Sequence, residues 1–157
     1  MCSIVSYRVE KDELRHPFLV EEESLEYGVS RVENPRDAVD ILNDVFRMKH
    51  LAEEMVCMIS MDTKGKVLGL FKVSQGSINN STCTPREIYL RALVSGAASI
   101  IVVHNHPSGD PLPSEMDMIV CERLVSAGRL MGIPVQDFII IGDTYYSFKE
   151  KEEWSLS

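Results

Sequence analysis

Residues 100–117 read IIVVHNHPSGDPLPSEMD, and this stretch sets the expected architecture of the chain around it. Its first four residues are a continuous apolar run, which is typical of a short strand covered on both faces. Three prolines and a glycine between residues 107 and 113 predict a tight, rigid turn. A helix is predicted from about residue 114 to about 131, where Gly132 and Pro134 end it. The stretch therefore predicts a buried strand whose end lies close to the start of a helix.

His104 and His106 stand where the predicted strand ends. Side chains separated by one residue point to the same side of a strand, so both imidazoles should face one way. Neutral imidazole is a good zinc ligand, and the turn delivers Ser114 and Asp117 to the same place. Two histidines and one carboxylate leave a fourth tetrahedral position for water, as catalytic zinc sites do. Zinc lowers the pKa of such a water to about 7, so the pattern predicts hydrolytic chemistry.

A structural explanation of the same residues stays open beside the metal site. Ser114 and Asp117 have the spacing of a helix N-cap and an acid at the third helical position, which needs no metal. A single His-x-His pattern is also a weak signal. This explanation does not account for two histidines that directly follow a buried strand and face the same turn. The sequence therefore favours the metal site.

Hydrophobic spacing and turn signals predict the remaining elements. Helices are expected at about 35–48, starting at Asn34-Pro35, and at about 84–96, where Thr84 and Glu87 have capping-box spacing. Strands are expected at residues 3–9, 54–62, 66–74, 135–142 and 145–148, with a hairpin turn at 62–65. Residues 10–32 are acidic and are interpreted as an irregular extension that packs loosely. The order of elements predicts an α/β or α+β sandwich, with one mixed sheet flanked by helices.

The composition limits the class of protein. The chain has 157 residues, which fits one domain, and its formal charge of −8 comes from 16 basic and 24 acidic residues. Since phosphate contacts need clustered lysine and arginine, direct DNA binding is not expected. The four cysteines form no Cys-x-x-Cys pair and are expected to be reduced. No apolar run approaches roughly 20 residues and no signal peptide is recognised, so we expect no membrane association and a cytoplasmic location.

The stretch 104–117 resembles the JAMM signature of JAB/MPN metalloproteases, in which His-x-His is followed after seven residues by Ser and after two more by Asp. The spelling HNHPSGDPLPS is similar to the RadC branch, as are residues 75–79, 85–88 and 135–143. The resemblance covers about residues 33–155. It implies an MPN domain over residues 33–157, a cytidine-deaminase-like sandwich, preceded by an N-terminal extension at residues 1–32 in place of the helix-hairpin-helix module of longer members.

The resemblance also implies roles for single residues. His104, His106 and Asp117 would bind zinc, and Ser114 would hydrogen-bond the reacting oxygen. The general base of the family is a glutamate eight residues before an Asp or Asn that closes the first strand of the hairpin, and counting back from Asp62 gives Glu54. Glu53 remains a competitor, because both faces of that strand are largely apolar and strand parity does not choose.

Two functions follow from the resemblance. The first is a zinc-dependent metallopeptidase in which zinc-activated water attacks an amide or isopeptide bond of a peptide or an isopeptide-linked protein. The alternative is a non-catalytic MPN interaction module associated with DNA repair or maintenance. The sequence does not identify the substrate or the oligomeric state.

Overall fold

The computed structural model describes residues 2–76 and 83–152. Within these residues the chain forms one mixed sheet of seven strands in the order β2-β1-β4-β3-β5-β6-β7. At its centre β3 (Met55–Met61) pairs antiparallel with β5 (Ser99–Asn105), and β5 pairs parallel with β6 (Val135–Ile141). Every residue of β3 and β5 is buried, as expected for strands covered on both faces.

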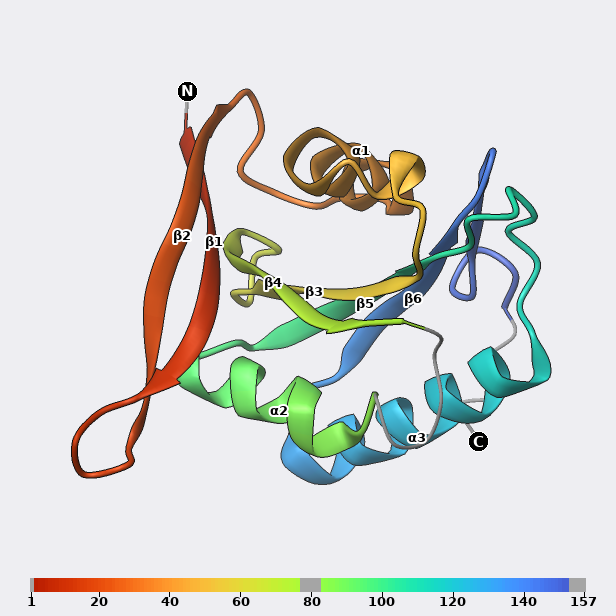
Figure 1. The fold of residues 1–157 in the computed structure, drawn as a ribbon. Helices are drawn as coiled ribbons and strands as arrows, with labels where there is room; N and C mark the ends of the chain where they lie inside the picture. The colour runs from red at the N-terminus through yellow and green to blue at the C-terminus, as the bar shows by residue number, and fades with distance from the viewer. Residues whose placement is uncertain (1, 77–82, 153–157) are drawn as a thin grey trace.

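Helices cover both faces of the sheet. The other strands are β1 (Cys2–Lys11), β2 (Pro17–Tyr27), β4 (Val67–Gln75) and β7 (Tyr145–Ser147). The helices are α1 (Pro35–Phe46), α2 (Pro85–Val94) and α3 (Glu115–Met131), with a short 3-10 helix η1 (Met48–His50) after α1. Figure 1 shows α1 on one side of the sheet and α2 and α3 on the other. The predicted mixed sheet flanked by helices is therefore confirmed.

Strand parity divides the core between the two faces. The even-numbered residues Ile100 and Val102 of β5 pack in one apolar cluster with α2 and α3, whereas the odd-numbered Ile101 and Val103 pack in a second cluster with α1. β3 follows the same rule, since Val56 belongs to the α2–α3 cluster. Residues that continue the even-numbered rows therefore lead toward α3.

The predicted helices and all six predicted strands are confirmed, with small differences at their ends. The hairpin predicted over residues 54–74 is the antiparallel pair β3–β4. Asn34, Thr84 and Ser114 each cap a helix by accepting a backbone N–H with the side chain. Of the predicted loop after β4, residues 77–82 lie outside the described residues, as does part of the family resemblance at 75–79.

The prediction that residues 10–32 form an irregular extension is wrong. Pro17–Tyr27 form β2, which pairs antiparallel with β1 from end to end and lies at the edge of the sheet. Most β2 side chains are exposed, so no alternation of apolar and polar residues marked the strand. The acidic run at residues 21–23 suits an edge strand, where charge discourages pairing with other chains. A domain boundary between residues 32 and 33 stays a prediction.

Two other expectations concern the whole chain. Among the described residues, no helix is both long enough and apolar enough to cross a membrane. All four cysteines are free, and burial raises the pKa of the thiols of Cys57, Cys83 and Cys121 to about 12. These three thiols are therefore protonated and unreactive near neutral pH.

Candidate metal centre

The candidate site lies at the end of the sheet face that carries the even-numbered side chains of β3 and β5. His104 is the last residue of β5 that pairs with β3, opposite Val56. Glu54 lies just before β3 and continues the row of Val56 toward α3. One carboxylate oxygen of Glu54 and one nitrogen from each of His104 and His106 lie within 4.8 Å of one another. Strand parity thus brings an acid and two imidazoles together at one end of the sheet.

Backbone carbonyls fix the orientation of both imidazoles. Nδ1 of His104 lies 3.3 Å from the carbonyl oxygen of Met55, and Nδ1 of His106 lies 2.8 Å from that of Asp110. Since a carbonyl oxygen only accepts, each Nδ1 is placed to donate to it, and an imidazole that carries its single proton on Nδ1 keeps the lone pair on Nε2 for a metal ion. Nε2 of His104 lies 3.5 Å from Oδ1 of Asp117, and Nε2 of His106 lies 3.1 Å from Oδ2. Both imidazoles therefore face the same carboxylate.

Asp117 is held by the first turn of α3. Ser114 is the N-cap, and its Oγ accepts the N–H of Asp117 at 3.1 Å. The N–H of Ser114 donates in return to Oδ2 of Asp117 at 2.7 Å. This reciprocal capping box is the structural role that the sequence allowed for these two residues. It coexists with the site, because it also fixes a fully buried carboxylate toward both histidines.

The arrangement fits a bound metal ion. Nε2 of His104 and Oδ1 of Asp117 are buried, and neither has a hydrogen-bond partner among the described residues. Burial lowers the pKa of His104, against the opposing effect of the Asp117 carboxylate, and this favours a neutral ring. A lone pair facing a buried carboxylate is unfavourable unless a cation binds both. Two atoms held tetrahedrally by one zinc ion at about 2.0–2.1 Å would lie roughly 3.3 Å apart, close to the observed separations of 3.5 and 3.1 Å.

Glu54 lies with the histidines, whereas Glu53 is engaged elsewhere. Glu53 is exposed, and its carboxylate accepts a hydrogen bond from the Gln75 amide at 2.9 Å. Glu54 is half-buried and lines a cavity of about 330 Å³ together with the two histidines, Ser114 and Asp117. The sequence left the choice open because it did not reveal which face of β3 is turned toward α3.

The loop at residues 107–113 packs against the turn between β6 and β7. The N–H of Asp143 donates to the carbonyl of Gly109 at 2.7 Å. Gly142 has no room for a side chain, since a Cβ there would lie 2.3 Å from the carbonyl oxygen of Gly109. The same loop supplies the Asp110 carbonyl that orients one imidazole. Close backbone packing at this turn therefore supports the site.

Gly142→Ala is expected to weaken metal binding about tenfold, because the new methyl group displaces loop 107–113 and the carbonyl that orients His106. Competition for zinc against a chelator of known affinity measures the change. Gly28→Ala is the matched control, since a Cβ at Gly28 meets no atom within 4 Å. Equal zinc affinities in the two variants would contradict this role of the loop.

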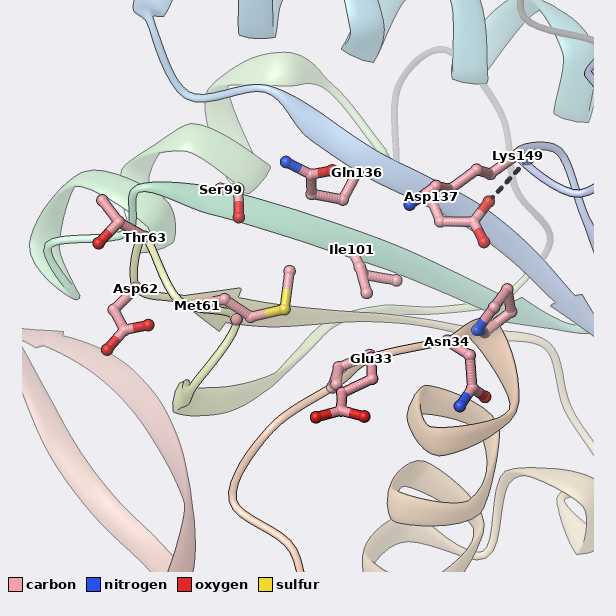
Figure 2. Close-up of a pocket in the computed structure, with 13 residues that line it drawn as sticks. Glu33, Asn34, Met61, Asp62, Thr63, Ser99, Ile101, Gln136, Asp137 and Lys149 are labelled. Carbon is pink, nitrogen blue, oxygen red and sulfur yellow. Dashed lines mark hydrogen bonds between the residues drawn. The ribbon is translucent and has the colours of Figure 1, made fainter.

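A second cavity, of about 220 Å³, lies at the opposite end of β5, between the starts of α1 and β6 (Figure 2). Its wall includes Asp137, whose carboxylate accepts from Oγ of Ser147 at 2.6 Å and from the backbone N–H of Lys149 at 3.1 Å. The carboxylate of Asp62 accepts two backbone N–H groups of its own turn. The carboxylates of Asp137 and Asp62 already accept hydrogen bonds from other groups of the protein. This cavity is therefore a weaker candidate for a ligand site than the cavity beside His104.

Asp137 makes the stability of the protein depend on pH. Burial raises its pKa to about 6, although hydrogen bonds from Ser147 and Lys149 oppose the shift. Between about pH 4 and about pH 6 the folded protein keeps a proton that the unfolded chain has released, so the free energy of unfolding falls as pH rises through this window. In Asp137→Asn, the free energy of unfolding is expected to fall by about 3 kcal/mol less over this pH range than in the wild type. Urea unfolding of both metal-free proteins at about pH 4 and about pH 7 measures the difference, and identical pH dependence would contradict the burial of a charge here.

Sequence reasoning missed the groups that orient the histidines. The carbonyls of Met55 and Asp110 gave no signal, because every residue has a carbonyl group. Their positions depend on the register between β3 and β5 and on the path of loop 107–113. Residue types alone do not reveal either of these.

Comparisons with known proteins show the family to which the chain belongs. The family model of the RadC-like JAB domain matches residues 32–154. A UPF0758 protein of Moorella thermoacetica is 46% identical over 121 residues, which is 76% of this chain and 52% of that protein. UPF0758 proteins of Alkaliphilus metalliredigens and Methanosarcina mazei are 44% and 43% identical, over 77% and 76% of this chain and 52% and 55% of their own lengths. The chain thus spans about half the length of these relatives. It belongs to the family of RadC-like JAB domain proteins.

Proposed function

We propose that the protein is a zinc-dependent hydrolase that cleaves an amide or isopeptide bond in a peptide or an isopeptide-linked protein. The observation that carries the proposal is the approach of two imidazole Nε2 atoms to the buried carboxylate of Asp117, with Glu54 beside them. Three ligands of this kind leave one tetrahedral position open, which distinguishes catalytic zinc from structural zinc.

His104, His106 and Asp117 are the residues that would hold the zinc ion. A bound zinc ion acts as a Lewis acid and makes water nucleophilic near neutral pH. His104 and Asp117 are completely buried, so bulk water does not compete for them from the core side. The cavity of about 330 Å³ on the other side gives room for the substrate.

Glu54 is the proposed general base. Its half-buried carboxylate lies at the wall of the cavity, near both imidazoles. A carboxylate in this place can accept a proton from the attacking water and pass it to the leaving amine. The carboxylate of Glu53 is hydrogen-bonded to Gln75, which makes it the weaker candidate.

Ser114 is proposed to stabilise the substrate oxygen that becomes negatively charged during attack. Its Oγ accepts the N–H of Asp117, and this bond fixes the oxygen atom while its own O–H remains able to donate. Ser114 lines the same cavity as Glu54. The helix cap would therefore orient the donor before the substrate binds, which is the condition for efficient electrostatic stabilisation.

Hydrolysis in oxygen-18-labelled water tests this function directly. The zinc-loaded protein is incubated with linear peptides and with peptides joined through a lysine side chain, and the products are analysed by mass spectrometry. One heavy oxygen is expected in each new carboxylate, and the activity should disappear with a chelator and return with zinc. Cleavage that persists in the chelator would contradict a zinc-dependent mechanism.

A further inference from the structure

Asn105, which lies between the two histidines, bonds to the chain on both sides of Glu54. Its side chain is buried, with 1% of the residue exposed. Oδ1 accepts the N–H of Met55 at 2.6 Å, and Nδ2 donates to the carbonyl of Glu53 at 3.1 Å. These two backbone groups belong to the peptide units that flank Glu54. One amide side chain therefore restrains both peptide planes, and with them the direction in which the Glu54 side chain leaves the backbone.

Glu54 needs this support because it lies outside the strand. The β3–β5 ladder ends at the pair of Val56 and His104, and Glu54 precedes the first residue of β3. Beyond that pair, the side chain of Asn105 provides hydrogen bonds that join β5 to the first residue of β3 and to the segment before it. A further bond, from the N–H of Gly76 to the carbonyl of Glu54 at 2.7 Å, holds the same segment from the side of β4.

Asparagine has the chemistry that this position demands. A carboxamide presents a donor and an acceptor together, whereas an ionised aspartate only accepts and a serine or threonine has a single oxygen. The N–H of Met55 can only donate and the carbonyl of Glu53 can only accept, so the two bonds fix the orientation of the amide. A buried amide is unfavourable unless it is hydrogen-bonded, which favours this one arrangement.

We propose that Asn105 is a positioning residue that holds the Glu54 carboxylate beside His104 and His106. The inference rests on the proposed function, since it assigns to Asn105 the task of placing the proposed base. Without the Asn105 amide, the segment that carries Glu54 has lost two bonds to β5, and its carboxylate samples a wider range of positions. The interaction of Glu54 with a bound metal centre should weaken accordingly.

Titration of the full chain with cobalt(II) tests this without a substrate, because the visible absorption of cobalt reports the geometry around the ion. Glu54→Gln and Asn105→Ala are each expected to weaken cobalt binding about tenfold and to change the spectrum in the same way. The double variant should bind no more weakly than either single variant, because both changes remove the same contribution. Asn43→Ala is the matched control, since its amide also accepts a backbone N–H, that of Lys49 at 2.9 Å, and it should keep the wild-type spectrum.

The outcomes separate this inference from the proposed function. A wild-type spectrum and affinity in Asn105→Ala, or additive losses in the double variant, would overturn the positioning role and leave the proposed function standing. Absence of cobalt binding by the wild-type protein would overturn both. If Asn105→Ala does not fold, Asn105→Asp replaces it, because aspartate keeps the acceptor for Met55 and lacks the donor for Glu53. The same spectral change is then expected, and an unchanged spectrum would overturn the role.

Discussion

Zinc is expected to raise the melting temperature of the wild-type protein by roughly 8–16 °C when free zinc exceeds its dissociation constant about a thousandfold. Asp117→Asn is expected to lose most of this shift. The asparagine fills the same space and can still accept the N–H of Ser114, but it has no negative charge to bind a cation placed between the two histidines. Its amide can instead donate to an Nε2 lone pair, so the metal-free variant should melt at or above the temperature of the metal-free wild type.

The matched control for this experiment is Asp37→Asn. Asp37 occupies the same position in the capping box of α1 as Asp117 does in that of α3. Differential scanning calorimetry with zinc and with a chelator should therefore show a full zinc shift in Asp37→Asn. If Asp117→Asn also keeps the full shift, the buried carboxylate serves only as a helix cap.

If the protein is the proposed hydrolase, Glu54→Gln is expected to lower the turnover number by about two to four orders of magnitude, which is the usual contribution of general acid–base catalysis in enzymes. The variant should still load with zinc when zinc is saturating, since His104, His106 and Asp117 are unchanged. Initial rates in the oxygen-18 assay, together with zinc content on the same samples, measure both quantities.

Glu53→Gln is the control for this loss, and its turnover should stay within about twofold of the wild type, because the side-chain oxygen of glutamine can still accept from Gln75. A comparable loss of activity in the two variants would mean that Glu54 has no special role. Full activity in Glu54→Gln would exclude it as the base.

A non-catalytic module associated with DNA repair or maintenance is the alternative function. In that case the zinc-loaded wild type would give no labelled product, and Glu54→Gln would change neither partner binding nor phenotype. Direct phosphate contacts are not favoured by the formal charge of −8. A non-catalytic module with this charge is therefore expected to bind a protein partner.

Much of the fold was predictable because its signals are local. The apolar run before His104 and the capping residues Asn34 and Ser114 each act through their immediate neighbours in the chain. β2 was missed because an exposed edge strand has no buried face, and without a buried face the sequence has no period of two. Its acidic run then resembled a loop.

The candidate site was predictable to the extent that its residues lie close in sequence. His104, His106 and Asp117 lie within one strand-turn-helix segment, so their spacing carried the information. Glu54 lies in a distant segment, just before β3, and only the observed faces of β3 and β5 bring it to the histidines in preference to Glu53. The amide of Asn105 was missed for the same reason, since its two bonds cross from β5 to the start of β3.

Anomalous diffraction at the zinc edge, from crystals grown with zinc, tests the central claim most directly. One strong peak is predicted within bonding distance of Nε2 of His104, Nε2 of His106 and a carboxylate oxygen of Asp117, with Glu54 facing the remaining position. No peak there, or a fourth protein ligand that closes the coordination sphere, would contradict the account.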